Sequence, residues 1–168
     1  MNEMADGIEV RDSSVEGKGV FADRPFHAGE RVLTIHDSRT VDDQHPLGPG
    51  DDPRHCDYLA AVRVVLMQPP ERHINHSCDP NVYVKTIDGR RVVIAIRDIA
   101  AGEEVAYDYC INSGGDTVWT CRCGSSRCRK TIHSDFFHLP VERQKEYLPL
   151  LDDWFRREHS AQIAELEN

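Results

Sequence analysis

The densest polar segment of this chain reads Arg72-His73-Ile74-Asn75-His76-Ser77-Cys78-Asp79-Pro80-Asn81. Asparagine, histidine, serine, aspartate and proline together are typical of an ordinary turn. Here, however, they are flanked by segments that read as β-strands. Buried polar groups need hydrogen-bond partners, so the segment either binds a polar ligand or braces the backbone. Composition alone leaves both interpretations open.

Short β-strands are expected on both sides of this segment. Alternating or turn-then-strand patterns occur at residues 8–11, 15–21, 26–33, 82–84, 92–96 and 101–109, and a β-branched run lies within 58–67. The dipeptide Asp88-Gly89, between two apolar runs, is typical of a tight hairpin. Residues 8–109 are therefore expected to be mainly β. The stretch at 36–56 is rich in Asp, Pro and Gly and is expected to be an exposed loop or insertion.

The C-terminal part of the chain has a different periodicity. From Pro149 to Leu166 the apolar residues recur at roughly helical spacing. This predicts an amphipathic helix, preceded by a short one around 141–148. Its apolar face either packs on its own domain or forms a dimer contact. The first interpretation is favoured because a single such face usually has an intramolecular partner.

Length and composition indicate one folded domain. The chain has 168 residues and 19.1 kDa, with 39% hydrophobic and 29% charged residues. No apolar run has the length of a membrane span, and the acidic N-terminus lacks the features of a signal peptide. A soluble intracellular protein, cytoplasmic or nuclear, is expected. The net charge of −9 argues against direct nucleic-acid binding. It fits a basic partner, or simply serves solubility.

Cysteine spacing indicates a metal site. Three of the six cysteines form the pattern Cys121-x-Cys123-x4-Cys128. Without an export signal, metal ligation is a better interpretation than disulfides. Structural Zn²⁺ is usually held by four ligands, so a fourth must come from elsewhere.

Four motifs, in order, together resemble the SET-domain protein lysine methyltransferases. They are Gly17-Lys18-Gly19-Val20-Phe21, Arg72-x-x-Asn75-His76-Ser77-Cys78-x-Pro80-Asn81, Gly102-Glu103-Glu104-Val105-x-Tyr107-Asp108-Tyr109 and Cys121-x-Cys123-Gly124-x-x-x-Cys128-Arg129. The resemblance covers roughly residues 8–133. It implies a mainly β fold, the SET-domain β-clip with a pseudoknot, in which the second and third motifs lie side by side. The expected parts are a SET domain at 8–110, a post-SET zinc module at 117–133 and a helical tail at 140–168.

The resemblance also implies S-adenosylmethionine as cofactor. The cofactor-binding residues that it indicates are Lys18, Gly19, Tyr58, Arg72, Asn75, His76, Tyr109 and Ile132. A glycine allows a ligand to approach the backbone closely, which suits position 19. Three of these residues have ordinary alternatives: a salt bridge for Arg72, a core or surface tyrosine for Tyr58, and a core residue for Ile132.

The family supplies the fourth zinc ligand from the second motif, here Cys78. Zinc would then be held by Cys78, Cys121, Cys123 and Cys128, which binds the post-SET loop over the active site. Cys110 is the rival for the fourth place, although it directly follows the catalytic tyrosine. Cys56 is interpreted as a lone thiol.

The reaction implied is methyl transfer to the ε-amine of a protein lysine, in a histone or another basic protein. Tyr109 resembles the family's catalytic tyrosine, and Tyr107 the position that limits the number of methyl groups. Both are expected on one face of a strand. Mono- or dimethylation is expected.

Two other classes of function remain open at this point. One is a catalytically inactive SET module that binds a peptide or partner. The other is a zinc-stabilised interaction module without cofactor. The chain is expected to be a monomer or homodimer without membrane association.

Overall fold

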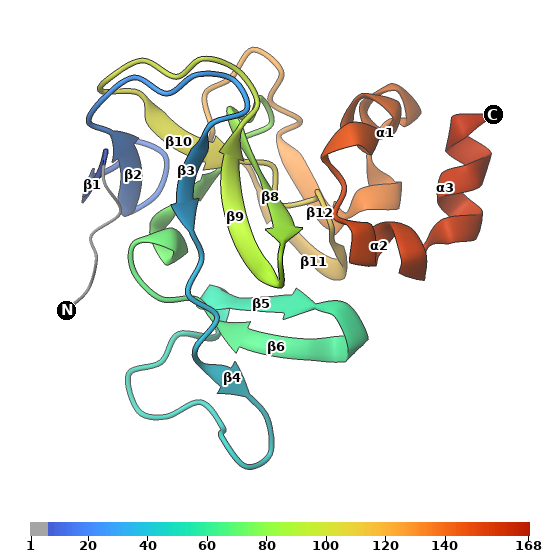
Figure 1. Ribbon diagram of the computed structural model, residues 1–168, viewed down its shortest axis with the longest axis horizontal. Coiled ribbons are helices and arrows are strands. Elements are labelled where there is room, and N and C mark those ends of the chain that lie inside the picture. The colour runs from blue at the N-terminus through green and yellow to red at the C-terminus, as the bar shows by residue number, and fades with distance from the viewer. Residues whose placement is uncertain (1–6) are drawn as a thin grey trace.

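The computed structural model describes residues 7–168. Short strands form four small sheets, and helices follow at the C-terminal end (Figure 1). The first two sheets have the orders β1(Ile8–Asp12)-β2(Lys18–Ala22)-β10(Glu104–Tyr107)-β7(Asn75–His76) and β3(Arg31–Thr34)-β9(Arg90–Ala95)-β8(Val82–Ile87). The other two are β4(Thr40–Val41)-β6(Arg63–Leu66)-β5(Cys56–Leu59) and β11(Gly114–Thr120)-β12(Thr131–Asp135). The mainly β fold class and the C-terminal helices are confirmed.

Strand β10 brings two of the sequence motifs together. It pairs antiparallel with β2 and parallel with β7, so that Ala106 lies opposite Asn75 and Tyr107 opposite His76. Further backbone bonds join Ser77 N–H to the Tyr107 carbonyl and Asn81 N–H to the Ala106 carbonyl. The expected side-by-side placement of these segments is therefore confirmed.

The hairpin predicted from Asp88-Gly89 joins β8 and β9. Both turn residues have positive φ, +50° and +74°, which is the conformation that two-residue hairpin turns require. Sheet β3-β9-β8 supplies Val82 and Val93, both fully buried, to the first of two apolar cores.

The insertion at 36–56 is more ordered than an exposed loop. Its strand β4 pairs with β6, and the three-residue 3₁₀ turn Pro53–His55 precedes β5. Arg91 of β9 fastens the insertion to the body of the molecule. Its guanidinium, 7% exposed, donates to both carboxylate oxygens of Asp37 (2.7 and 2.8 Å) and to Asp57. A composition rich in Asp and Gly did not reveal these ion pairs.

The C-terminal tail is not one helix from 149 to 166, and that prediction is wrong. It contains α1(Val141–Tyr147), a 3₁₀ turn at Leu148–Leu150, α2(Asp153–Glu158) and α3(Ser160–Glu167). Asp152 is extended because its N–H donates to Asn112 Oδ1 (2.7 Å) and its carboxylate accepts from Thr86 (2.6 and 2.8 Å). His159, with φ −114° and ψ 28°, separates α2 from α3.

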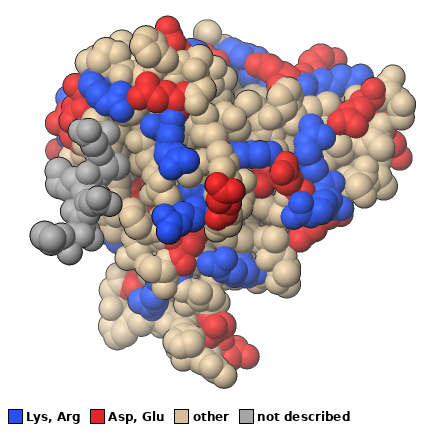
Figure 2. Space-filling model, viewed as in Figure 1, with Lys and Arg blue, Asp and Glu red and all other residues tan. Residues whose placement is uncertain are grey.

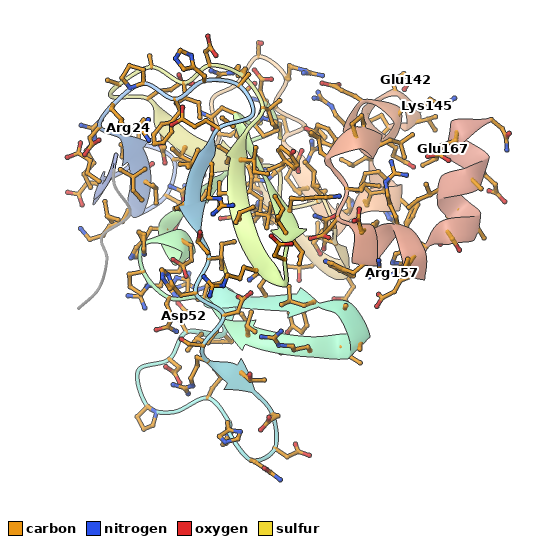
Figure 3. The ribbon with its side chains drawn as sticks, in the orientation of Figure 1. Arg24, Asp52, Glu142, Lys145, Arg157 and Glu167 are labelled. Atoms are coloured by element: carbon orange, nitrogen blue, oxygen red, sulfur yellow. The ribbon has the colours of Figure 1, made fainter. Side chains whose placement is uncertain are left out.

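The tail does pack on its own domain, as expected. Its buried apolar residues join the cysteine segment in a second core that contains Cys78, Cys110, Ile111, Cys121, Ile132, Phe136, Leu139, Tyr147, Leu151, Phe155 and Ile163. The charged residues Glu142, Lys145, Arg157 and Glu167 point away from this core (Figure 3). Within residues 7–168 no helix is both long and apolar enough to cross a membrane.

Candidate active site and metal centre

Gly19 lies where β2 passes over the carboxylate of Glu104. A Cβ at position 19 would lie 2.3 Å from Glu104 Oε1, so no side chain fits there unless that carboxylate moves. Glu104 is itself held, because it accepts from the Ser13 hydroxyl (2.8 and 2.9 Å) and from Asn75 Nδ2 (2.8 Å). The glycine therefore keeps β2, Glu104 and the second motif in close contact.

The side chain of Asn75 braces the turn before β2. Its Nδ2 also donates to the carbonyls of Glu16 (3.2 Å) and Lys18 (3.1 Å). Asn75 is 8% exposed, and among the described residues none donates to its Oδ1. The sequence left open whether this segment binds a ligand or braces the backbone, and the amide nitrogen of Asn75 braces the backbone. The amide oxygen remains available to accept a hydrogen bond from a ligand.

We expect Asn75→Ala to weaken binding of S-adenosylmethionine about tenfold or more. The substitution removes the free amide oxygen, so a cofactor group buried against it would be left unpaired at a cost of about 1–3 kcal/mol. Calorimetric titration with S-adenosylhomocysteine measures the effect. Asn112→Ala is the matched control, since it removes a bracing amide that joins Asp152 and Val84 instead. Wild-type affinity in folded Asn75→Ala would remove this residue from the cofactor site.

Tyr107 and Tyr109 lie together, although the strand ends between them. Tyr107 is the last residue of β10, and Tyr109 lies in the following turn. The expectation that both tyrosines lie on one face of a strand is therefore wrong. Their ring centroids are nevertheless 4.8 Å apart. The Tyr109 hydroxyl donates to the carbonyl of Ile74 (2.7 Å), and 36% of the residue is exposed. Burial of the hydroxyl groups raises the pKa of both phenols, so both stay protonated at neutral pH.

His76 connects this tyrosine pair to the cysteines. Its Nδ1 accepts from the N–H of Tyr109 (3.1 Å), which assigns the ring proton to Nε2, 3.5 Å from Cys78 Sγ. Burial lowers the pKa of His76 to about 4, against the opposing effect of Asp108, so the ring is neutral at pH 7. Both ring nitrogens are therefore committed to the protein, and only the face and the backbone of His76 remain for a cofactor.

Trp119 of β11 completes this cluster, and the sequence analysis missed it. Its ring lies 5.5 Å from that of His76 and 6.1 Å from that of Tyr109. A tryptophan two residues before Cys121, on a predicted zinc module, was the available signal. The post-SET hairpin thus contributes an aromatic wall to the site.

Four thiols fit a zinc site. The Sγ atoms of Cys78, Cys121, Cys123 and Cys128 lie within 4.8 Å of one another, and those of Cys78 and Cys121 are 3.8 Å apart. A tetrahedral ion with bonds of about 2.3 Å separates its sulfur ligands by about 3.8 Å. Burial raises the pKa of the Cys123 thiol, but hydrogen bonds from the N–H groups of Cys78 and Ser125 outweigh this effect and lower the pKa to about 7. The lower pKa favours the thiolate, which is the form that binds zinc.

The two remaining cysteines lie outside this group. Cys110 is fully buried, but its thiol donates to the carbonyl of His133 (3.1 Å) instead. Cys56 begins β5 in the insertion, far along the chain from the cluster. The thiol of Cys78 is thus the fourth member of the group, as the resemblance implied.

The other predicted cofactor-binding residues do not belong to the cluster formed by Tyr107, Tyr109, His76 and Trp119. Lys18 is exposed, and its carbonyl accepts from Asn75. Arg72 is exposed and donates to His73 Nε2 (3.4 Å) without a salt bridge to any described residue. Tyr58 is 67% exposed on β5, with no described hydrogen bond or ring contact to the motifs. Ile132 has no exposed surface and packs in the second core. These four roles remain predictions.

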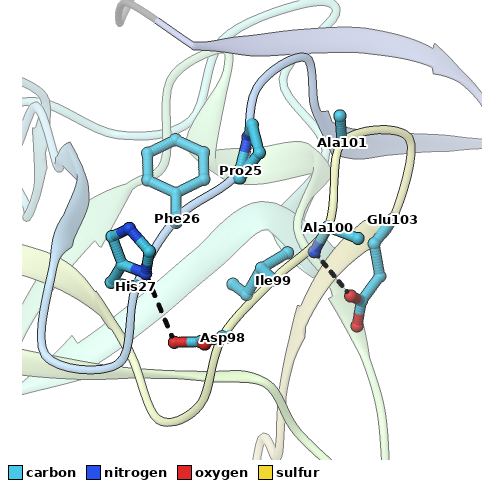
Figure 4. A pocket seen from close by; sticks show the side chains of 8 residues that line it. All are labelled: Pro25, Phe26, His27, Asp98, Ile99, Ala100, Ala101 and Glu103. Carbon is cyan, nitrogen blue, oxygen red and sulfur yellow. Dashed lines mark hydrogen bonds and ion pairs between the residues drawn. The ribbon is translucent and has the colours of Figure 1, made fainter.

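A surface hollow of about 330 Å³ lies elsewhere, between the segments 25–27 and 98–103 (Figure 4). Phe26 and Ile99 form its floor, and His27 with Asp98 stand at its rim, 3.7 Å apart. It contains none of the predicted site residues.

Comparison with known proteins identifies the family. The SET domain model matches residues 17–110. Similar curated proteins include histone-lysine N-methyltransferase trithorax of Drosophila virilis (32% identity over 143 residues) and histone-lysine N-methyltransferase 2B of Homo sapiens (30% over 141 residues). Each match covers 76% of this chain but only 4% and 5%, respectively, of those much longer proteins.

A solved structure has the same fold. It is the crystal structure of KRYPTONITE in complex with mCHG DNA and SAH, with a TM-score of 0.57 and 23% identity. The match covers 74% of this chain and 28% of that one. With the parallel pairing of β7 and β10, the four-thiol cluster and the match to the family model, the chain belongs to the SET-domain family.

Proposed function

We propose that this chain transfers a methyl group from S-adenosylmethionine to the ε-amine of a lysine in a protein substrate. The observation that carries the proposal is the placement of Tyr109. Its hydroxyl is bonded to the Ile74 carbonyl, beside Tyr107 and under Trp119, where the second and third motifs meet. The printed names of the relatives, histone-lysine N-methyltransferases, and the SAH held by KRYPTONITE support it.

The domain boundaries belong to the same proposal. We assign a SET domain to residues 8–110, a post-SET zinc module to 117–133 and a helical tail to 140–168. Zinc would be held by Cys78, Cys121, Cys123 and Cys128 and would fix the hairpin that carries Trp119. S-adenosylmethionine supplies an electrophilic methyl group on a positive sulfur.

The protein's own groups would mainly align the reactants. A lysine amine attacks only when neutral, and its ordinary pKa is about 10.4. The aromatic side chains of Tyr107, Tyr109 and Trp119 would partly desolvate the amine and so lower its pKa. The amine would give its proton to water before it attacks, so that no dedicated base is needed. Because the Tyr109 hydroxyl donates its hydrogen to the Ile74 carbonyl, the lone pairs of its oxygen point in a fixed direction. They orient the amine for in-line attack.

The net charge of −9 gives modest support to a basic substrate segment. The chain carries 29 acidic against 20 basic residues, which favours encounter with a lysine-rich, histone-like segment. On the face shown in Figure 2, acidic and basic side chains are interspersed and neither sign dominates. Charge would thus steer the partner weakly and leave the choice of lysine to the site. An intracellular location accompanies this proposal.

The direct test is transfer of radiolabelled methyl groups by the zinc-loaded protein to histones and to a cell lysate, followed by mass mapping of labelled lysines. Labelled lysine in a protein supports the proposal. Tight binding of S-adenosylhomocysteine with no transfer to any substrate would favour the inactive partner-binding module. An absence of cofactor binding would favour a zinc-stabilised interaction module.

The product of the wild-type protein is expected to be mono- or dimethyl-lysine. The Tyr107 hydroxyl can bond the amine or hold a water, which leaves little room for added methyl groups. Tyr107→Phe removes that oxygen and should shift the final product by one further methyl group while activity is retained. Mass spectrometry of a peptide methylated to exhaustion measures it. Abundant trimethyl-lysine from the wild type, or an unchanged product from Tyr107→Phe, would contradict the assignment.

A further inference from the structure

The C-terminal tail reaches the site through one buried tyrosine. Tyr147 ends α1 and is 2% exposed. Its hydroxyl donates to Asp108 Oδ2 at 3.1 Å, across 39 residues of sequence. Asp108 is the middle residue of the Tyr-Asp-Tyr motif. A side chain of the tail thus contacts the backbone segment that carries both active-site tyrosines.

Asp108 is a fully buried acceptor of several hydrogen bonds. Besides Tyr147, the Arg129 guanidinium donates to both of its oxygens (2.6 and 3.0 Å), and the N–H of Cys110 donates at 3.1 Å. Burial alone would raise the pKa of Asp108, but the hydrogen bonds from Arg129 lower it below its ordinary value. The carboxylate is therefore charged and held in place by a donor from its own turn and by donors from two distant segments.

Asp108 also connects the tyrosines to the zinc module. Arg129 follows the ligand Cys128, and its N–H lies 3.4 Å from Cys78 Sγ. On the opposite side, Asp108 Oδ1 lies 3.7 Å from His76 Nδ1, the atom that accepts from the N–H of Tyr109. A shift of the carboxylate would therefore move the zinc loop and the turn at Tyr109 together.

The tail also contacts the zinc loop and the β5–β6 hairpin, each through one glutamate. Glu146 of α1 pairs with Arg127, inside the zinc loop, at 2.6 Å. Glu158 at the end of α2 accepts from the N–H of Ala61 (3.1 Å), at the tip of the β5–β6 hairpin. Both contacts are exposed and contribute little alone. They show that the tail spans from the β5–β6 hairpin to the zinc loop, and the buried contact of Tyr147 with Asp108 lies between them.

We propose that the C-terminal tail is a positioning element of the transfer site, in which Tyr147 acts through Asp108 to hold the Tyr109 turn and the Trp119 hairpin in register. The expected change in kcat rests on the proposed methyl transfer, whereas the expected change in the position of the Trp119 hairpin does not. The competing interpretation is that the tail only stabilises the fold. The two interpretations differ in the expected effect of removing the Tyr147 hydroxyl on the order of the hairpin and on turnover.

The test uses Tyr147→Phe, which keeps the ring and removes the hydroxyl. The chain has two tryptophans, so Trp154→Phe as background leaves Trp119 as the only fluorescent reporter of the hairpin. In the full-length, zinc-loaded protein, Tyr147→Phe should raise quenching of Trp119 by acrylamide about twofold. Small misalignments reduce rates by up to about 10²-fold, so kcat should fall about tenfold with the KM for peptide little changed.

The matched control is Ile163→Ala in α3, which removes a buried apolar contact of the tail and leaves the Tyr147–Asp108 bond intact. It should lower the melting temperature but leave Trp119 quenching and kcat at wild-type values well below that temperature. Equal losses in both variants, or wild-type quenching and kcat in Tyr147→Phe, would overturn the inference. If the wild type transfers no methyl group at all, the Trp119 measurement still decides between the two interpretations.

Discussion

Tyr109→Phe is expected to bind S-adenosylmethionine with near wild-type affinity and to lose at least about 10²-fold in turnover. The phenylalanine ring retains the contacts with Tyr107, His76 and Trp119, whose centroids lie 4.8–6.1 Å from that of Tyr109. Only the oxygen bonded to the Ile74 carbonyl is removed. Orientation of reactants accounts for factors of this size, and its loss affects kcat more than ground-state binding.

Single-turnover transfer to a lysine peptide at saturating cofactor measures this loss, with cofactor affinity measured separately. Tyr83→Phe on β8 is the matched control, because it removes a phenol oxygen from a strand outside the predicted site. Tyr83→Phe should transfer at the wild-type rate. Full activity in Tyr109→Phe would refute the catalytic assignment and with it the mechanism proposed above.

Cys78→Ser is expected to reduce zinc from one ion per chain to almost none. Structural zinc sites bind with about 10–16 kcal/mol at neutral pH, and that binding is coupled to folding. Loss of one thiolate from a group in which two sulfurs lie 3.8 Å apart leaves three ligands in the loop that joins β11 to β12, and the residues of β11 are mostly exposed. The hairpin should lose order while the strands of the first core stay folded.

Metal analysis and amide exchange of residues 114–135 test this result. Because Cys78 is itself buried, Cys123→Ser provides a second variant at the half-buried edge of the cluster and should lose zinc as well. Cys110→Ser is the control and should retain one zinc per chain, since that thiol bonds to the His133 carbonyl. Loss of zinc in Cys110→Ser with full zinc in Cys78→Ser would show that the wrong fourth ligand was chosen.

Local patterns predicted strands at β1, β2, β3, β8, β9 and β10 and the β8–β9 hairpin, because turn chemistry and side-chain alternation act over a few residues. The tight turn at Asp88-Gly89 is an example. These patterns gave no strand at β4, β11 or β12. The pairing of β7 with β10 involves only two residue pairs and leaves no periodicity to read. It was expected only from the resemblance of the two motifs to a known family.

Long-range polar contacts could not be read from the sequence. The break in the tail at Asp152 depends on Asn112 and Thr86, which belong to other elements. Likewise, composition left open whether the segment around Asn75 binds a ligand or braces the backbone, and the structure shows that the amide nitrogen donates to the Glu16 and Lys18 carbonyls. Helical spacing and composition contain no information about such partners, so the sequence suggested a longer helix and could not assign the Asn75 amide.

The bond between Tyr109 and Ile74 has a consequence for the order in which the molecule assembles. It joins residues 35 positions apart, and the Tyr147–Asp108 bond adds a span of 39. Hairpins such as β1–β2 and β8–β9 close over a few residues, whereas contacts of long sequence separation form late. We therefore expect these hairpins to form early in the nascent chain, whereas the contact of Tyr147 with Asp108 can form only after α1 has been synthesised.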